Sequence, residues 1–484
     1  MNRDEPKTIV LFGVPFHDVT MDETLAEIDG IINRREPRYI ATANLDFAAQ
    51  ASRDVELQRI LMDAHMVLCD GTPLVWASRL LKCALRERVA GSDLTPRLMA
   101  HAAQKGYRIF FLGSDDRVLG AAKVKLEREY PGLQVCGILA PPYAKLLELD
   151  NDTIAAQVRE ARPDILLVAL GAPKQEKWIY MNHRDLGVPC SVGIGASLDF
   201  AAGKFSRAPV WMQVGGLEWL FRLMQEPRRL AARYYDDFKF FVSAFLKQWR
   251  ELRTSAPQQV GHPPAPVEED MAQYRWIGRV DAAAAHAGRL AVPGPQGNRC
   301  VAVLELSGVS FMDSIALGLI MKGFKQCKAA GGGLILLQPS DPVRRVVETL
   351  KLDRLIPIAA SMEEARGFSR SLHVTELPQC EVFQAQRRMV VRCIGDLTAA
   401  TAGHMADLIA AKWSAHEWAR FITVDLSAVH FIDSSGLDAL VRSRALAQSR
   451  RGGRFTITGA NANIRNVLAL GRLAEPLDVN SHAA

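Results

Sequence analysis

The sequence lacks any apolar run long enough to cross a bilayer as a helix, which takes about 18 to 20 residues. Its eight cysteines are scattered without a CxxC or other paired spacing, which excludes a disulfide framework and the usual zinc sites. The chain starts with Met-Asn-Arg-Asp-Glu-Pro-Lys, which has no signal-peptide pattern. These absences predict a cytoplasmic protein whose contact with any membrane is peripheral.

A strong charge of one sign is also missing. The formal net charge of +6 over 484 residues is too weak for a dedicated nucleic-acid binder, so no nucleic-acid partner is expected. No GxGxxG follows the first apolar run, where Gly13-Val14-Pro15-Phe16 stands, and this disfavours a dinucleotide cofactor. A content of 49% hydrophobic residues is typical of globular proteins, and the length predicts about three domains.

Residues 1–203 alternate short apolar runs with amphipathic stretches, which predicts an α/β domain with a Rossmann-like, mostly parallel sheet. The predicted strands are Thr8–Val14, Arg38–Ala43, Met66–Cys69, Tyr107–Leu112, Leu133–Ile138, Asp164–Leu170 and Cys190–Ile194. The predicted helices include Met21–Arg34, Arg117–Tyr130 and Thr153–Arg162. In such sheets ligands bind beyond the carboxyl ends of the strands.

Small and polar residues gather in the loops after these strands. Glycines let a backbone approach a diphosphate closely, a lysine offsets its charge, and a helix start offers free amides. The loops therefore indicate a nucleotide or sugar-phosphate site. The residues singled out are Thr42, Asn44, Asp70, Gly113, Ser114, Gly171, Pro173, Lys174, Gln175, Glu176, Gly193, Gly195 and Asp199.

No metal site is predicted, and no cofactor is expected. Asp150-Asn151-Asp152 has the pattern of a DxD metal-binding motif. It directly precedes a predicted helix, however, where Asp and Asn cap free amides, and capping is the favoured interpretation. The histidines His17, His65 and His101 have no spacing suggestive of a metal.

Residues 204–253 form a helical, basic and aromatic appendage. Such a segment predicts contact with an anionic membrane surface, with arginines toward the headgroups and aromatic rings in the interface. The alternative is a helix that packs its aromatic side chains on the core, and both can hold in different helices. Residues 254–270, rich in Pro and Gln, are predicted to be a linker.

The remainder contains an internal repeat. Leu306-Ser307-Gly308-Val309-Ser310-Phe311-Met312-Asp313-Ser314 recurs 120 positions later as Leu426-Ser427-Ala428-Val429-His430-Phe431-Ile432-Asp433-Ser434. This period is too long for a solenoid, so the repeat predicts two copies of one α/β domain, at 271–374 and 379–484.

Six ordered motifs between Ile9 and Arg250 resemble those of the WecG/TagA/CpsF family, glycosyltransferase family 26. They are Thr42-Ala43-Asn44-Leu45-Asp46-Phe47, Cys69-Asp70-Gly71, Glu87-Arg88-Val89-Ala90-Gly91-Ser92-Asp93, Pro141-Pro142-Tyr143, Gly171-Ala172-Pro173-Lys174-Gln175-Glu176 and Gly216-Leu217-Glu218-Trp219. The resemblance implies a GT-E type fold and inverting, metal-independent transfer of a sugar. The donor would be a UDP-sugar and the acceptor an undecaprenyl-diphosphate-linked sugar, in cell-surface or exopolysaccharide biosynthesis. A homo-oligomer is compatible with the family.

The same resemblance assigns roles. It makes Asp70 the general base, with Thr42 and Asn44 beside it, and places Arg88 near the donor diphosphate. It places the nucleotide near Gly171, Pro173, Lys174, Gln175, Glu176, Gly193, Gly195 and Asp199. It implies that appendage arginines reach the site, with Arg228, Arg229 and Arg233 as candidates.

One loop departs from the family pattern. Gly195-Ala196-Ser197-Leu198-Asp199-Phe200 stands where the family usually has Gly-Gly-x-Phe-Asp-Phe. Because this loop lies near the donor, the sugar remains open among N-acetylhexosamines, hexoses and uronic-acid derivatives.

The repeated domains resemble STAS domains through Asp433-Ser434-Ser435-Gly436-Leu437. In the anti-sigma factor antagonist group a kinase phosphorylates the serine after the aspartate, which makes Ser434 a candidate site and implies a kinase or anti-sigma-like partner. The first copy offers Ser314 but lacks the second serine and the glycine, so it is degenerate. The alternative is that these serine hydroxyls cap a helix, and for Ser314 capping is favoured.

Two functions follow from these observations. The first is a membrane-associated glycosyltransferase that STAS modules regulate or localise. The second is a signalling scaffold whose enzyme-like domain only senses a nucleotide sugar. Retention of Thr42, Asn44, Asp70 and Arg88 favours the enzyme, because a decayed domain is expected to lose its base.

Overall fold

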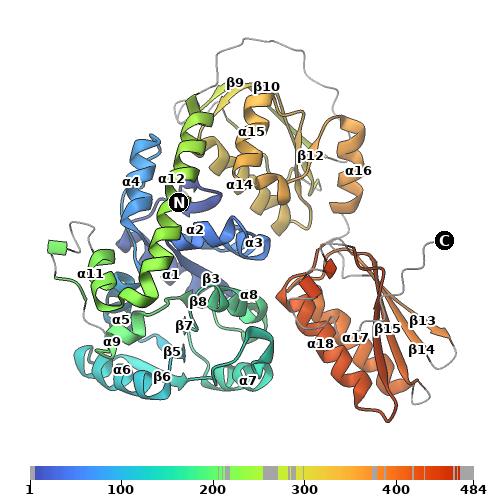
Figure 1. Cartoon of the computed structure of the whole chain (residues 1–484), viewed down its shortest axis with the longest axis horizontal. Coiled ribbons are helices and arrows are strands. Elements are labelled where there is room, and N and C mark those ends of the chain that lie inside the picture. Colours follow the sequence, from blue (N-terminus) through green and yellow to red (C-terminus); the bar gives the residue numbers. More distant parts are fainter. Residues whose placement is uncertain are drawn as a thin grey trace. The chain divides into compact units, whose positions relative to one another are not determined.

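The structure is a computed structural model, and its parts are shown in Figure 1. It describes residues 6–204, 207–209, 211–212, 218–253, 271–281, 284, 290–297, 299–372, 379–385, 388–416, 419–429, 431–461, 464–465 and 467–468. The predicted linker 254–270 and the motif residues Gly216 and Leu217 lie outside these ranges. The chain forms two compact units. The first contains Met1–Ala144 and Leu149–Phe368, and the second contains Lys145–Glu148 and Ser369–Ala484.

A six-stranded parallel sheet forms the centre of the enzyme domain, with the order β4-β3-β8-β7-β5-β6. Its strands are β3 (Arg38–Ala43), β4 (Met66–Cys69), β5 (Arg108–Gly113), β6 (Gln134–Leu139), β7 (Ile165–Ala169) and β8 (Cys190–Gly193). Each end lies within one residue of its predicted position. The α/β fold with a mostly parallel sheet is confirmed.

Helices pack on this sheet, and some of them contribute to its apolar core through residues such as Ile28, Leu98, Leu119 and Leu198. The helices are α1 (Met21–Arg34), α2 (Leu45–Ala51), α3 (Val55–Asp63), α4 (Thr72–Leu80), α5 (Gly91–Lys105), α6 (Asp116–Glu129), α7 (Asn151–Ala161), α8 (Lys174–Leu186) and α9 (Ser197–Ala201). The capping interpretation of Asp150-Asn151-Asp152 is confirmed, because Asp150 Oδ1 accepts a hydrogen bond from Thr153 N at 3.1 Å at the start of α7.

The predicted strand Thr8–Val14 is wrong. The segment is an antiparallel hairpin of β1 (Thr8–Leu11) and β2 (Val14–His17), separate from the large sheet. The chain turns at Phe12 and Gly13, whose φ angles are +53° and +83°. An uninterrupted apolar run conceals this turn, because Phe12 is not a residue that favours positive φ.

The appendage contains α11 (Glu218–Gln225) and the long helix α12 (Pro227–Arg253). Helix α12 packs against α2 and, further along, against α15 of the first STAS domain. The rings of Phe240 and Phe241 meet the ring of Phe12 edge-on, with centroids 6.1 and 5.9 Å away. The alternative that appendage aromatics pack on the core is therefore confirmed for this face of α12. None of the helices in the described ranges is both long and apolar enough to span a membrane.

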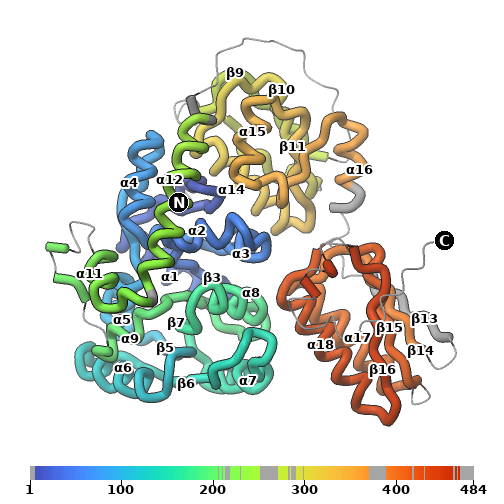
Figure 2. The backbone as a smooth tube through the Cα atoms, in the orientation of Figure 1, coloured from blue at the N-terminus to red at the C-terminus, as the bar shows by residue number. Residues whose placement is uncertain are grey.

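The first STAS domain has a parallel sheet in the order β12-β11-β10-β9. Its elements are β9 (Ala272–Val280), β10 (Ala302–Met312), α14 (Ser314–Ala329), β11 (Leu334–Leu337), α15 (Asp341–Thr349), η2 (Leu352–Arg354), β12 (Ile358–Ala359) and α16 (Met362–Leu372). It belongs to the same compact unit as the enzyme domain. Figure 2 traces α12 from α11, alongside α2, to this domain.

The second STAS domain is in the other unit and has the sheet order β13-β14-β15-β16, in which only the β13–β14 pair is antiparallel. Its elements are β13 (Gln379–Ala385), β14 (Arg388–Ile394), α17 (Ala402–Ala415), β15 (Phe421–Ala428), α18 (Ser434–Gln448) and β16 (Arg454–Thr458), and η1 (Leu146–Glu148) falls in this unit too. The strand-to-helix junctions β10–α14 and β15–α18 occupy the two repeated segments, so both copies adopt the same local structure.

Candidate active site

The predicted catalytic residues lie at the carboxyl ends of three neighbouring strands. Thr42 is on β3, Asp70 directly follows β4, and Gly193 ends β8. The Thr42 hydroxyl donates a hydrogen bond to the Gly193 carbonyl at 2.8 Å. Asn44 caps α2, where its Oδ1 accepts from Phe47 N at 3.2 Å. The sheet order, which chain order does not reveal, brings these residues together.

The Asp70 carboxylate is anchored at the start of α5. Its Oδ2 accepts a hydrogen bond from Gly91 N at 3.3 Å. A Cβ at Gly91 would lie 3.3 Å from both Thr42 Oγ1 and Ser197 Oγ, so these groups surround the same small space. Burial raises the pKa of Asp70, while the nearby Arg88 and Arg222 guanidinium groups oppose that rise. A carboxylate in this environment is a stronger base than an exposed one.

A cluster of guanidinium and carboxylate groups lies beside Asp70. Arg88 pairs with Asp93 at 2.5 Å and with Glu218 of α11 at 3.4 Å. Arg207 pairs with the other oxygens of the same two carboxylates, at 2.7 and 3.5 Å. Arg222 lies 4.0 Å from Glu218. The appendage therefore contributes Arg207, Glu218 and Arg222 to the site.

Sequence reasoning missed Arg207 and Arg222. Of the appendage arginines it proposed, Arg228 is exposed, Arg233 pairs with Asp46 at 2.7 Å, and the side chain of Arg229 lies outside the described structure. The sequence contained a signal for Arg222. This residue follows Glu218 of the Gly216–Trp219 motif by four positions, so the two side chains lie on the same face of a helix. The roles of Arg228, Arg229 and Arg233 stay predictions.

Two of these guanidinium groups have a buried N–H group without a hydrogen-bond acceptor among the described residues. The Nε atoms of Arg207 and Arg222 are buried and have no hydrogen-bond partner among the residues that the structure describes. Buried donors are normally satisfied, so an unpaired pair of them at one site indicates an anionic ligand with several oxygens.

Gln175 and Glu176 support the loop that follows β8. The Gln175 amide donates to Glu176 Oε1 at 2.7 Å and accepts from Gly195 N at 3.2 Å. A Cβ at Gly193 would lie 2.8 Å from Glu176 Oε1, so glycine is required there by close packing. Burial raises the pKa of Glu176 to about 8, and the side chain is therefore mostly protonated at neutral pH. The pair lies beneath the loop and shapes it.

Lys174 contacts the loop that precedes η1, and its predicted role of offsetting a diphosphate charge stays a prediction. Its Nζ donates to the Ala144 carbonyl at 2.6 Å and lies 5.9 Å from the centre of the Tyr143 ring. It therefore holds the Pro141–Ala144 loop in place. In the same motif Gly171 has a φ of +80° with open space around it, and Pro173 follows a cis peptide bond.

Ser114 and Asp199 form a second contact between strand ends. Ser114 Oγ donates to Asp199 Oδ1 at 3.2 Å, and Lys204 pairs with the same carboxylate at 3.2 Å. A Cβ at Gly113 would lie 2.5 Å from the Ala169 carbonyl, so strand packing requires this glycine. Asp115 caps α6, where its Oδ1 accepts a hydrogen bond from Val118 N at 2.9 Å, so this helix-start amide already has a partner.

The repeated serines are not helix caps, which corrects that interpretation. The preceding aspartates cap instead. Asp313 accepts hydrogen bonds from Ile315 N and Ala316 N in the first copy. Asp433 accepts from Ser435 N and Gly436 N in the second copy. Ser314 is fully buried, and Ser434 is 6% exposed.

The described residues contain no group of three or more His, Cys, Asp or Glu side chains arranged to hold a metal ion. Apart from this, the strand ends bring the half-buried Asp70 carboxylate next to a cluster of three guanidinium groups, those of Arg88, Arg207 and Arg222. That combination suits proton removal from a hydroxyl beside a diphosphate.

Comparison with known proteins identifies the families to which the domains belong. The glycosyl transferase WecG/TagA/CpsF family matches residues 9–255, and the STAS domain family matches residues 262–365 and 379–483. The chain is a glycosyltransferase followed by two STAS domains. It belongs to the WecG/TagA/CpsF family.

Two curated relatives illustrate the match. The N-acetylglucosaminyldiphosphoundecaprenol N-acetyl-beta-D-mannosaminyltransferase of Bacillus subtilis (strain 168) is 35% identical over 228 residues, which cover 47% of this chain and 86% of the relative. The enzyme of the same name from Staphylococcus aureus (strain MW2) is 26% identical over 253 residues, covering 52% of this chain and 97% of the relative.

Proposed function

We propose that the protein transfers a sugar from a UDP-sugar, with inversion, to an undecaprenyl-diphosphate-linked acceptor in the synthesis of a cell-surface or exported polysaccharide. The observation that carries the proposal is the half-buried Asp70 carboxylate at the end of β4, whose pKa is raised by desolvation, beside Arg88 and Arg222. The relatives suggest an N-acetylglucosamine-bearing acceptor and an N-acetylhexosamine donor as the first substrates to test.

The reaction requires one base and one departing diphosphate. Asp70 takes the proton from the acceptor hydroxyl while that oxygen bonds to the anomeric carbon of the donor sugar. The bond between this carbon and the β-phosphate oxygen breaks, and UDP leaves with the electron pair. A single displacement of this kind inverts the configuration at the anomeric carbon.

The guanidinium groups of Arg88, Arg207 and Arg222 are proposed to bind the donor diphosphate. Arginine matches phosphate oxygens with parallel N–H donors, and the buried Nε donors of Arg207 and Arg222 remain unpaired among the described residues. Charge that develops on the leaving UDP is stabilised by donors already in place. Asp93 and Glu218 hold two of these arginines before the substrate arrives.

The exposed face of α12 is proposed to lie on the inner face of the membrane. Tyr235, Phe238, Val242 and Leu246 recur at helical spacing and are 60%, 64%, 39% and 43% exposed. Basic side chains, among them Lys239 with its Nζ 4.0 Å from the Tyr235 ring centre, flank this stripe. An apolar stripe with basic neighbours suits an anionic lipid surface and brings a lipid-linked acceptor to the enzyme.

The test measures UDP release and analyses lipid-linked products by mass spectrometry. We expect turnover with at least one UDP-sugar and a loss of about 100-fold or more in Asp70→Asn, because a general base is removed. Asp150→Asn is the matched control, since asparagine also caps a helix and activity should be retained. Binding of UDP-sugar without turnover across a broad panel would instead support the nucleotide-sugar-sensing scaffold.

The second STAS domain is proposed to bind a regulatory partner, with Ser434 as its phosphorylation site. A phosphate at the start of α18 would add nearly two charges where Asp433 already accepts amide hydrogen bonds, and so change the binding surface. Mass spectrometry of the chain isolated from its own cells should find phosphate at Ser434 but none at Ser314. Phosphate at Ser314 alone would contradict this assignment.

A further inference from the structure

The first STAS domain docks on the enzyme domain through the start of helix α14. Ser314, its first residue, is fully buried. Gly318, one turn further along, approaches β1 so closely that an added Cβ would lie 1.9 Å from the Thr8 carbonyl oxygen. The end of the domain that carries the repeated Asp-Ser motif is thus covered by the enzyme hairpin.

Gln248 of α12 connects three parts of this contact. Its Nε2 donates to Ser314 Oγ at 3.1 Å and to the Val10 carbonyl at 3.2 Å, and its Oε1 accepts from Phe12 N at 3.1 Å. The side chain is 2% exposed. A buried amide with all these hydrogen bonds is costly to separate from its partners, because each would be left unsatisfied.

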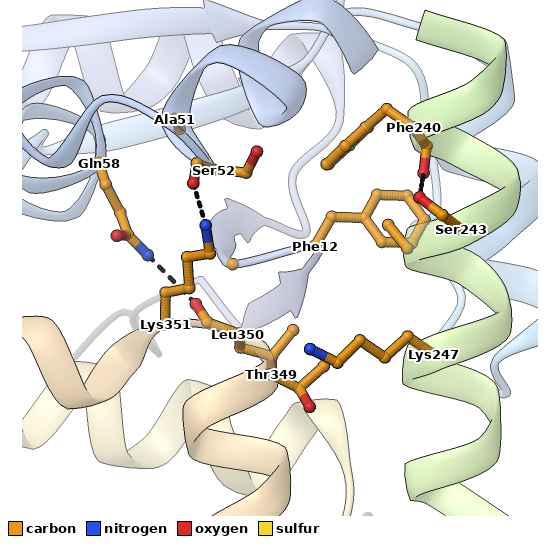
Figure 3. Close-up of a pocket in the computed structure, with 12 residues that line it drawn as sticks. Phe12, Ala51, Ser52, Gln58, Phe240, Ser243, Lys247, Thr349, Leu350 and Lys351 are labelled. Carbon is orange, nitrogen blue, oxygen red and sulfur yellow. Dashed lines mark hydrogen bonds between the residues drawn. The ribbon is translucent and has the colours of Figure 1, made fainter.

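Further contacts extend the interface on both sides. Lys325 Nζ donates to the Ala64 carbonyl at 2.7 Å. In Figure 3, the Lys351 ammonium points to the Ser52 carbonyl, and Gln58 donates to the Leu350 carbonyl at 3.2 Å. The Lys351 and Gln58 bonds border a cavity of about 190 Å³, on whose far side lies α12.

The two domains also share a hydrophobic core. Val10 of β1 and Met62 of α3 are 0% and 1% exposed and belong to the same apolar cluster as the core of the first STAS domain. A polar regulatory surface that releases its partner would not need such residues. Apolar side chains buried jointly from both sides are typical of a permanent interface.

Helix α12 leads from this interface to the active site. Arg233 pairs with Asp46, two residues beyond Asn44, and lies about 22 Å along the helix from Gln248 at 1.5 Å per residue. The ring of Tyr234 meets that of Trp219 edge-on at 6.0 Å, which ties α12 to the helix that carries Glu218 and Arg222. One rigid helix therefore contacts both the STAS domain and the elements of the site.

We propose that the first STAS domain is a fixed intramolecular partner of the glycosyltransferase domain, which it binds through Ser314 and Gly318, and that this docking holds α12, and with it the appendage residues, in the active position. The part that concerns activity rests on the proposed transferase function. The degenerate Asp-Ser motif serves as a docking surface in this copy.

A cross-link tests the docking without reference to activity. The Cys83 thiol lies in hydrogen-bond range of Ser314, so Ser314→Cys in the full chain should form a disulfide with native Cys83. Both positions are buried and burial raises the pKa of the Cys83 thiol to about 11, so the bond has to form before the interface closes. The full chain is therefore unfolded and refolded in a glutathione buffer, whose disulfide takes up the two electrons and two protons that the thiols lose. The control is Ser307→Cys, at an exposed position of the same domain, which should not link to Cys83. A folded Ser314→Cys chain in which no disulfide joins positions 83 and 314 overturns the proposal.

A pair of glycine variants tests the control of α12. Gly318→Ala places a methyl group against the Thr8 carbonyl, whereas Gly367→Ala on α16 adds the same methyl group where nothing lies within 4 Å. We expect Gly318→Ala to speed amide exchange in the hairpin and in α12 by about tenfold or more and to slow sugar transfer by about as much, because the close contact is lost. Gly367→Ala should change neither by more than about twofold.

Unchanged exchange in α12 and an unchanged transfer rate in Gly318→Ala would overturn the proposal. If the wild-type chain transfers no sugar at all, the proposed function fails, while the cross-link and the amide exchange still decide the docking. The two failures are therefore distinguishable.

Discussion

At the scale of single residues, the site is governed by how burial sets the charge of two carboxyl groups. Asp70 and Glu176 both have raised pKa values because they are buried. Asp70 has Arg88 and Arg222 nearby and can serve as a base, whereas the side-chain hydrogen-bond partner of Glu176 is the neutral Gln175. A desolvated carboxyl group can therefore serve as a base, as at Asp70, or remain protonated and support a loop, as at Glu176.

Arg222→Ala should shift the pH dependence of catalysis. Arg222 lowers the pKa of Asp70, so its removal lets that pKa rise further and moves the acidic limb of kcat/KM to higher pH, by about one unit. The measurement is kcat/KM for sugar transfer between about pH 5 and pH 8. Arg128→Ala, at an exposed position on α6, is the control and should leave the profile in place. An unshifted limb in Arg222→Ala would remove Asp70 as the titrating base.

Glu176→Gln should make stability less dependent on pH. The folded chain holds the Glu176 proton up to about pH 8, whereas the unfolded chain loses it near 4.5, so the wild type loses stability as the pH rises between these values. Glutamine mimics the protonated acid and has no such loss. Thermal unfolding from pH 5 to 8 should therefore show a smaller fall in Tm for the variant than for the wild type. Glu160→Gln, exposed on α7, is the control, and equal slopes in wild type and Glu176→Gln would contradict the expectation.

At the scale of elements, helix α12 has two unlike faces. Phe240 and Phe241 pack on Phe12 of the hairpin, while Phe238 and Leu246 on another face are exposed. The long apolar and basic pattern in the sequence fits both a packed helix and a surface helix. Only the positions of the neighbouring elements decide which rings are covered.

Phe238→Asp should weaken binding to anionic vesicles. An exposed phenyl ring that enters the interface contributes about 1.5 to 3 kcal/mol, so the binding constant should fall about tenfold or more. Co-sedimentation with vesicles of phosphatidylglycerol measures the effect. Val124→Asp on α6, where the native side chain is 68% exposed, adds the same charge away from the stripe and should bind as the wild type does. Equal losses in the two variants would assign the effect to charge alone.

At the scale of the whole molecule, the chain consists of two compact units and not of one enzyme with two equivalent modules. The enzyme domain and the first STAS domain share an apolar cluster, whereas the second STAS domain has its own core. The repeat in the sequence predicts two copies of one fold and gives no sign of this difference. It arises because one copy buries its helix start against the hairpin.

Core truncations should separate the two units in unfolding. Leu317→Ala and Leu426→Ala each remove a fully buried side chain and should cost about 2 to 5 kcal/mol. Leu317→Ala should destabilise the first STAS domain together with the β1–β2 hairpin, while Leu426→Ala should affect only the second STAS domain. Hydrogen exchange measured by peptide in increasing denaturant resolves these regions. If Leu317→Ala leaves the hairpin unaffected, the two domains do not unfold as one unit.

Much of the enzyme fold was predictable because its signals are local. Strand ends fell within one residue, and the cap at Asp150 was recognised from three consecutive polar residues before a helix. The turn at Phe12 was missed because no turn residue other than Gly13 marks it. Arg207 was missed because its proximity to Asp93 joins segments that are far apart along the chain.

The sequence by itself determined the alternation of strands and helices, the cap at Asp150, the family and the two STAS copies, because hydrophobic period, capping chemistry and ordered motifs all reside within short segments. The tertiary structure alone decided that Arg222 lies beside Asp70 and that Ser314 is buried against Gln248. Both contacts depend on which distant segments pack together. That packing is set by the apolar surface buried over the whole unit, and it cannot be inferred from any short segment of the sequence.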